Sequence, residues 1–414
     1  MTATKATIPK EDFDIFMGIN PAQPVDQLAF GLIKMTFAYD ASGNVRLEKP
    51  LPLYNNFFDP DEIPRLKAGC EFWPFKEGTD IALQGKAVPR DGVPVRSMNV
   101  KLQVGEYSKK VAVFGERRVR CRRAGEIFFT PPELFEQVNL SYENAYGGID
   151  WRVPVEEPLT WTVKFQLQAD HPGLYPRNHF GKGYVVLPDP EDIDGIALPC
   201  LEDPSDLLTE DRLVAGDPRL WHKQPLPWCL DWMPVFFYPR YAFFGGVDGW
   251  YPAPEDSVAE VRMGVLPRNY RTIFQESFLD SLDFDIRFFS EASYGLSVPF
   301  LEGNEPVLLQ GVHPQGSVLF NLPGKPLVEL YIDREKATSA PKLHSLLFLP
   351  QEWKFSMVWA ILSPLPRPFV PGIHKTIPLR CRVNNGPLYE YEAPQPVEES
   401  VKAFLQQNKG NSQQ

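Results

Sequence analysis

Apolar and polar residues alternate with a period of two along much of this chain, which is the pattern of a half-buried β-strand. The clearest stretch is 161–168, where Trp, Val, Phe and Leu occupy every second position between Thr, Lys and Gln. Residues 33–39 alternate in the same way, so we expect Lys34 and Thr36 to face solvent. Because residues 40–44 favour a turn, the sequence predicts an N-terminal hairpin there.

The same alternation recurs in short segments that are separated by proline and glycine. Those at 81–88, 98–104, 109–114 and 117–123 are expected to form a meander. Later strands are predicted at 183–187, 307–312, 317–322, 327–333, 355–362 and 378–383. The helical signal is weak, with helical spacing over 396–407 before a polar tail. The expected fold is mainly β, with antiparallel sheets packed as a sandwich or a distorted barrel, long irregular loops and little helix.

Composition supports a turn-rich β protein. Of 414 residues, 43 are proline, which is about twice the average usage of roughly 5%. The net charge of −11 argues against a general nucleic-acid binder and is compatible with a basic protein partner. The 5 cysteines are widely spaced, which favours reduced thiols over a disulfide framework or a zinc site. No segment has the ~18 apolar residues of a membrane span, so we expect a soluble, cytoplasmic protein.

An aromatic stretch at 221–251 departs from the alternating pattern. Prolines prevent it from forming one long helix. Core packing is one interpretation, since Trp and Phe bury well. The alternative is a docking surface for a protein partner, where exposed Trp and Tyr are enriched. The residues that such a surface would use are Trp221, Trp228, Trp232, Phe236 and Tyr238.

The strongest charge feature is the run Glu-Arg-Arg-Val-Arg-Cys-Arg-Arg at 116–123. If it is a strand, Val119 points inward while Arg118, Arg120 and Arg122 line the other face. Such a face can simply be solvated and discourage edge-to-edge aggregation. It can also be a basic stripe for an acidic segment of a partner, a role that suits the planar guanidinium.

Motifs of catalytic chemistry are scarce, because HExxH, GxSxG, GxxxxGK[ST] and GxGxxG do not occur in the sequence. His171 and His179 lie in one predicted loop, but a metal site needs three or four converging ligands. Exposed loop histidines are therefore the simpler interpretation. Asp283 and Asp285 would share one face of a strand and act as an acid–base pair, although neighbouring carboxylates are usually solvated. We expect no cofactor and no metal.

Two unusual phrases stand close together, Ser-Tyr-Glu-Asn-Ala-Tyr-Gly-Gly at 141–148 and Tyr-Pro-Arg-Asn-His-Phe-Gly-Lys-Gly-Tyr at 175–184. They predict loops with special backbone conformations, because their glycines suit positive φ. Their aromatic and arginine side chains would hold such a loop in place. The residues of this structural motif are Tyr142, Glu143, Tyr146, Gly147, Gly148, Arg177, Asn178, Gly181 and Gly183.

The two phrases resemble those of a bacterial family catalogued as a domain of unknown function, whose members are encoded beside type VI secretion spike proteins. The resemblance covers residues 13–362, as one unit or as two packed β subdomains. It is poorly kept at about 213–280, which indicates a divergent insert. Residues 363–414 are expected to be a C-terminal extension with a final strand, a short helix and a frayed tail. Further blocks that carry the resemblance are 78–85, 98–118, 198–204, 283–289 and 313–324.

The resemblance implies a cytoplasmic adaptor or chaperone without enzymatic activity. It would bind a secreted effector, such as a PAAR-linked toxin, and help to load it onto the VgrG spike, without nucleic acid or membrane as partners. Such work needs a broad, partly apolar surface and moderate affinity, so that the cargo can be released. Two alternatives stay open. One is a hydrolase that acts on glycan or peptide through Asp283 and Asp285, or through His171 and His179, and the other is a structural component of the secretion machine.

Overall fold

The computed structural model describes most of the chain, and these residues form mainly strands and the turns between them. Within them, no helix is long and apolar enough to cross a membrane. The predicted strand at 161–168 and the predicted helix at 396–407 lie outside the described residues. The described residues are 12–20, 28–54, 71–72, 75–122, 126–154, 171–234, 237–240, 286–366 and 377–392.

The largest sheet is formed by the strands β1 (Asp14–Asn20), β2 (Leu28–Tyr39), β3 (Val45–Glu48), β4 (Thr79–Leu83), β14 (Ser297–Val298), β19 (Lys342–Leu349) and β20 (Lys354–Pro364). Their order is β1-β2-β20-β19-β4-β14, with β3 paired to β2. The pairing of β2 with β3 confirms the predicted N-terminal hairpin. β19 runs antiparallel to β20 and parallel to β4.

β2 lies inside this sheet and is buried on both faces. The expectation that Lys34 and Thr36 face solvent is therefore wrong. The Lys34 ammonium donates to the two Glu71 carboxylate oxygens at 2.8 and 2.7 Å, and lies 3.9 Å from the centre of the Tyr54 ring. The Thr36 hydroxyl accepts a hydrogen bond from the backbone N–H of Leu51 at 2.9 Å. Later segments of the chain thus cover the second face and satisfy its polar groups.

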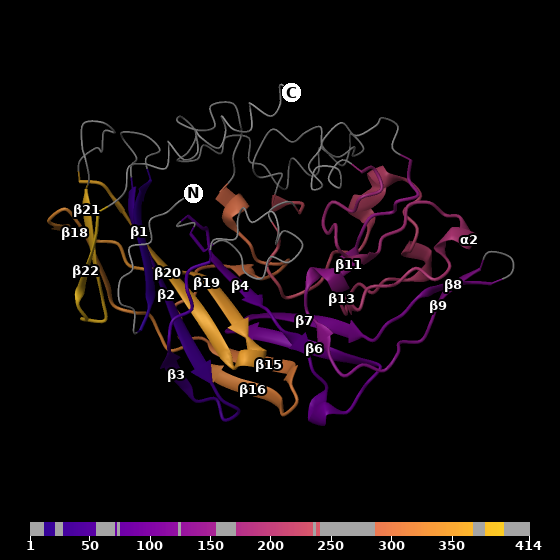
Figure 1. Cartoon of the computed structure of the whole chain (residues 1–414), viewed down its shortest axis with the longest axis horizontal. Helices are drawn as coiled ribbons and strands as arrows, with labels where there is room; N and C mark the ends of the chain where they lie inside the picture. The colour runs from indigo at the N-terminus through magenta and orange to yellow at the C-terminus, as the bar shows by residue number, and fades with distance from the viewer. Residues whose placement is uncertain are drawn as a thin grey trace, which may run out of the picture.

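A second sheet is formed by β6 (Ser97–Val104), β7 (Tyr107–Phe114), β13 (Leu201–Glu202), β15 (Pro306–His313) and β16 (Gly316–Asn321), in the order β13-β7-β6-β15-β16. It packs face to face with the first sheet, as Figure 1 shows. The Phe320 ring in β16 stacks on Tyr39 and Phe355 of the first sheet, at 4.7 and 5.3 Å between ring centres. The expected mainly β fold is confirmed as a sandwich, and none of the described sheets closes into a barrel.

The expected meander over 81–123 is only partly correct. β6 and β7 form a hairpin, as predicted. β4, however, belongs to the first sheet, since it pairs with β14 and β19. The last predicted strand of the meander, β8 (Val119–Cys121), pairs with β9 (Ile127–Phe129) in a small sheet separate from β6 and β7.

A third sheet contains β17 (Val328–Ile332), β18 (Glu335–Lys336), β21 (Pro378–Val383) and β22 (Leu388–Glu392), in the order β18-β17-β21-β22. β21 matches a predicted strand of the expected C-terminal extension. It pairs with β17, which precedes the boundary expected at 362–363, and that boundary falls within β20. The described strands on the two sides of the boundary therefore share one sheet.

The described residues between 115 and 234, here called the loop module, form a layer of loops beside β6 and β7 (Figure 1, magenta). The module has a small apolar core of its own, around Tyr146, Tyr175, Tyr184 and Trp221. Besides β8, β9 and β13, its short strands are β10 (Val138–Asn139), which pairs with β5 (Lys86–Ala87), and β11 (Tyr146–Gly147), which pairs with β12 (Lys182–Gly183). The described helices are all short: η2 (Arg90–Gly92), η3 (Tyr142–Asn144), α2 (Pro190–Ile193), η4 (Glu210–Arg212), η5 (Pro218–Lys223), η6 (Ile286–Phe289) and η7 (Pro350–Glu352).

Candidate functional site

The two signature phrases lie side by side in the loop module. β11 and β12 pair in parallel, which sets Tyr146 opposite Lys182. Asn178, which is fully buried, donates through its amide nitrogen to the carbonyl oxygens of Tyr142 and Tyr146 at 2.8 and 3.0 Å. Its amide oxygen accepts the backbone N–H of Phe180 at 3.1 Å. One side chain therefore joins both phrases, and we call this arrangement the Asn178 hub.

Glycines allow the backbone to approach Asn178 closely. A Cβ atom at Gly181 would lie 2.5 Å from the carbonyl oxygen of Ala145 and 2.5 Å from the Asn178 amide nitrogen. Gly148 has a φ of 112°, a conformation that L side chains rarely adopt. Gly147 pairs with Gly183 in the short parallel ladder. Glycine at these positions therefore allows the close backbone approach and the positive φ that the hub requires.

Polar side chains of the hub also hold the start of the aromatic stretch. The Tyr146 hydroxyl donates to the side-chain oxygen of Gln224 at 3.0 Å, and the Tyr175 hydroxyl donates to the carbonyl oxygen of Pro225 at 2.6 Å. The Arg177 guanidinium lies 5.1 Å from the centre of the Trp221 ring. Glu143, another residue of the predicted motif, is exposed instead.

The described aromatic residues of 221–251 lie in packing contacts. Trp221 and Trp232 are buried, and Tyr238 is 8% exposed. Trp228 is partly buried, and its indole N–H donates to the carbonyl oxygen of Lys110 at 2.6 Å. Phe236 lies outside the described residues. A partner would reach Trp221, Trp232 and Tyr238 only if the surrounding segments moved, whereas part of Trp228 is accessible.

The arginine stripe lies on β8 and its flanks, with Val119 buried and the three guanidinium groups exposed. Arg120 pairs with Asp194 at 3.1 Å, and Arg122 pairs with Glu126 at 3.1 Å. Arg118 donates to the carbonyl oxygen of Gly195 at 3.0 Å. Neighbouring acidic groups therefore neutralise much of this stripe before any partner arrives.

The two histidines of the hydrolase interpretation pack against different aromatic rings. His171 and His179 are buried, so the expectation of exposed loop histidines is wrong. His171 packs against Trp151, with 4.8 Å between ring centres, while His179 packs against Phe237 at 5.1 Å. Burial lowers the pKa of the His179 imidazole to about 3, which keeps it neutral. Asp283 and Asp285 lie outside the described residues, and the described part of the chain has no group of three potential metal ligands.

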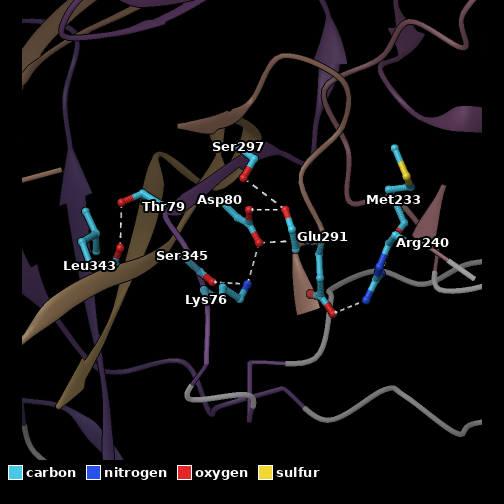
Figure 2. Close-up of polar contacts among 10 residues, drawn as sticks. Lys76, Thr79, Asp80, Met233, Arg240, Glu291, Ser297, Leu343 and Ser345 are labelled. Atoms are coloured by element: carbon cyan, nitrogen blue, oxygen red, sulfur yellow. Dashed lines mark hydrogen bonds and ion pairs between the residues drawn. The ribbon is translucent and has the colours of Figure 1, made fainter. Parts of the chain in front are cut away.

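A buried ionic network that the sequence did not predict surrounds Asp80 of β4 (Figure 2). Its carboxylate accepts hydrogen bonds from the Lys76 ammonium at 2.7 Å, the Ser290 hydroxyl at 2.8 Å and the Glu291 backbone N–H at 2.8 Å. The Glu291 carboxylate in turn pairs with Arg240 at 3.2 Å. Residues 241–285 lie outside the described ranges, and Arg240 and Glu291 stand on either side of them in the sequence. The network thus brings the two flanks of that segment together.

A pocket of about 490 Å³ lies beside the Asn178 hub. Asn144 and Lys182, one from each signature phrase, line it together, and the Lys182 ammonium donates to the Asn144 side-chain oxygen at 3.0 Å. Burial raises the pKa of the Cys200 thiol at this pocket, so the thiol stays protonated. The remaining lining residues are Lys86, Gly115, Glu116, Glu133, Leu134, Phe135, Gln137, Val138 and Asn139.

Two exposed apolar side chains of the loop module were not singled out from the sequence. Trp151 is 64% exposed, and Leu134, at the rim of the pocket, is 61% exposed. Tryptophan is enriched among the residues that carry most of the binding energy at protein–protein interfaces. Neither stands in an apolar run, so periodicity had no means of marking them.

Comparison with known proteins gives one match. The model of a family described as "Uncharacterized protein conserved in bacteria (DUF2169)" matches residues 26–360, which is most of the chain. No curated protein and no solved structure matches the chain.

Proposed function

The chain belongs to the bacterial family DUF2169, and we propose that it is a non-enzymatic cytoplasmic adaptor or chaperone for a type VI secretion effector. In this proposal it binds a PAAR-linked toxin and helps to seat the toxin on the VgrG spike. The link to secretion comes from the resemblance of the two phrases at 141–148 and 175–184. The structure supports the binding part of the proposal through the organisation of the loop module.

The observation that carries the proposal is the Asn178 hub. Loops that a rigid scaffold positions are the usual carriers of binding function. Here a fully buried amide fixes the two phrases, and Ala145 of the first phrase forms a bridge with Leu201 of β13, which pairs with β7 of the second sheet. A surface whose loops are ordered before binding loses less conformational entropy when a partner docks. Trp151 and Leu134 offer exposed apolar contacts on that surface.

Several buried ionisable groups are held in packing contacts, although burial raises the pKa of the Asp231 carboxyl to about 7. Asp80 is paired with Lys76, and Glu291 is paired with Arg240. His179 is held neutral by burial. A general acid or base needs access to substrate, and the two ion pairs and His179 are buried in packing contacts instead.

The test is recovery of the partner from the native host. We would express the full chain with a tag while the secretion genes are active, and identify co-purifying proteins by mass spectrometry against a tag-only control. The proposal predicts strong enrichment of a PAAR-bearing or spike-associated toxin. Recovery of the chain without any effector or spike component would contradict it and would direct attention to hydrolase assays on glycans and peptides.

A second readout separates an adaptor from a structural component. Assembled secretion particles would be purified and probed for the chain. An adaptor releases its cargo and is left behind, so we expect the chain to be depleted from particles that contain the toxin. A fixed stoichiometry of the chain in the particles would instead favour a structural role.

A further inference from the structure

The pocket beside the Asn178 hub has charged walls, and three of its charged residues have no ion-pair partner among the described residues, whereas Glu116 pairs with Arg118. Lys86 and Lys182 both line it, and among the described residues neither ammonium has a carboxylate within ion-pair distance. Glu133 on the rim likewise has no ion pair to any described residue. By contrast, the acidic and basic groups of the arginine stripe are largely paired with each other. The three unpaired charges of the pocket are therefore available to a ligand.

The floor of the pocket fixes the position of one of these cations. The Lys182 side chain is held by the Asn144 oxygen, and the Asn144 amide nitrogen donates to the carbonyl oxygen of Asn139 at 3.0 Å. Lys182 also belongs to β12, whose pairing with β11 is part of the hub. A cation that is held in place by a hydrogen-bonded neighbour loses little side-chain entropy when it binds an anion.

The size and apolar content of the pocket match a short piece of polypeptide. A volume of about 490 Å³ lies within the range of sites that enclose small ligands, and is too small for a folded domain. The exposed Leu134 and the largely buried Phe135 provide apolar surface beside the charges. A partner segment with an apolar residue next to its charged residues would use both features.

We infer that this pocket binds a short extended segment of the cargo protein that carries an acidic residue beside a basic one. The carboxylate of the segment pairs with Lys182 and Lys86, its cation pairs with Glu133, and an adjacent apolar side chain packs on Leu134. The glutamates on the rim disfavour a purely acidic segment, since like charges at an interface are unfavourable. The inference rests on the proposed adaptor function and names the surface through which it works.

The experiment uses the full chain and the partner that the wild-type protein recovers. Binding of that partner would be measured for the double variant Lys86→Glu/Lys182→Glu and for Lys182→Gln, a milder change that removes the charge of Lys182 and keeps a hydrogen-bond donor for Asn144. Lys110→Glu is the matched control, because Lys110 is an exposed lysine of β7 away from the pocket lining. Thermal unfolding of each variant checks that the fold is kept.

We expect the double variant to weaken binding by about a hundredfold and Lys182→Gln by about tenfold, while Lys110→Glu stays within about twofold. Replacement of one acidic residue of the cargo by lysine should restore binding to the double variant. Unchanged affinity in folded pocket variants would overturn this inference and leave the adaptor proposal standing. Failure of the wild-type chain to recover any partner would overturn both, so the two failures are distinguishable.

Discussion

The β-sandwich and the loop module are held together in different ways. The sandwich buries apolar side chains from alternate strand positions, such as Phe320 and Phe355, which stack on each other across the two sheets. The loop module has a smaller apolar core, and Asn178 alone makes two hydrogen bonds between its phrases and a third within its own phrase. Stability in the sandwich is therefore spread over many contacts, whereas in the loop module it is concentrated in a few polar groups. Substitutions should unfold the first region globally and the second locally.

The largest loss is expected from Phe355→Ala in the sandwich. Phe355 is fully buried and stacks on Phe37 and Phe320, so its removal leaves a cavity and should cost about 3–5 kcal/mol of unfolding free energy. A denaturant titration followed by hydrogen exchange should show that protection falls in all sheets together. Leu319→Ala is the control, because this residue of β16 is 65% exposed and its loss should cost less than about 0.5 kcal/mol.

The next largest effect is expected from Asn178→Ala in the hub. The substitution leaves the carbonyl oxygen of Tyr146 without its Asn178 donor and removes one of two donors to that of Tyr142, which should cost about 3 kcal/mol. Hydrogen exchange measured by mass spectrometry should show faster exchange in the phrases at 141–148 and 175–184, while β2 and β20 keep their protection. Equal loss of protection in β2 would contradict the contrast between the two regions.

A smaller effect is expected from acid, through His313, a buried histidine of the sandwich. Burial lowers the pKa of His313 to about 4, and its ring accepts or donates a hydrogen bond with the Tyr39 hydroxyl at 3.0 Å. Between about pH 6.5 and pH 4 the unfolded chain binds a proton that the folded chain does not, so stability falls as the pH falls through this window. At pH 5 the loss should be about 2 kcal/mol.

The measurement for His313 is the denaturation midpoint between pH 7 and pH 4.5. His313→Gln keeps a neutral hydrogen-bonding group opposite Tyr39 and does not titrate. It should therefore have a shallower dependence of stability on pH than the wild-type chain. An identical slope in both proteins would show that other groups account for the acid sensitivity.

The smallest effect is expected from Arg120→Ala in the arginine stripe. The ion pair with Asp194 is exposed, and exposed pairs contribute between about 0 and 1 kcal/mol. The unfolding midpoint should hardly move, and raising the salt concentration should remove the remaining difference. A loss of several kcal/mol would mean that the stripe supports the loop module in the way that Asn178 does.

The alternation of apolar and polar residues predicted those strands of the sandwich that bury one face and expose the other. The strands near 307–312 and 317–322 were expected from alternation, and β15 and β16 occupy those positions. β19 was missed because its residues are buried on both faces, so its sequence does not alternate. Lys34 was misplaced for the same reason, since a period of two identifies the two faces of a strand and says nothing about what packs on them.

Only part of the candidate functional site could be predicted from the sequence. Glycines and aromatics predicted that the two signature phrases form loops with special backbone conformations. Residue types that suit special φ angles can be recognised in a single sequence. The pairing of Asn178 with Tyr142 joins residues that are 36 positions apart, and the bond from Ser290 to Asp80 spans 210 positions. No local pattern contains such contacts. The pocket, which gathers Lys86, Glu133 and Lys182 from separate segments, was hidden for the same reason.

The central claim is that the loop module is the surface that holds the cargo. Hydrogen exchange of the full chain, measured with and without the partner recovered from the native host, tests it most directly. The account predicts new protection at residues 84–88, 131–145 and 180–184, with little change in the strands of the third sheet. Protection confined to β17, β21 and β22, with the loop module unchanged, would contradict the claim.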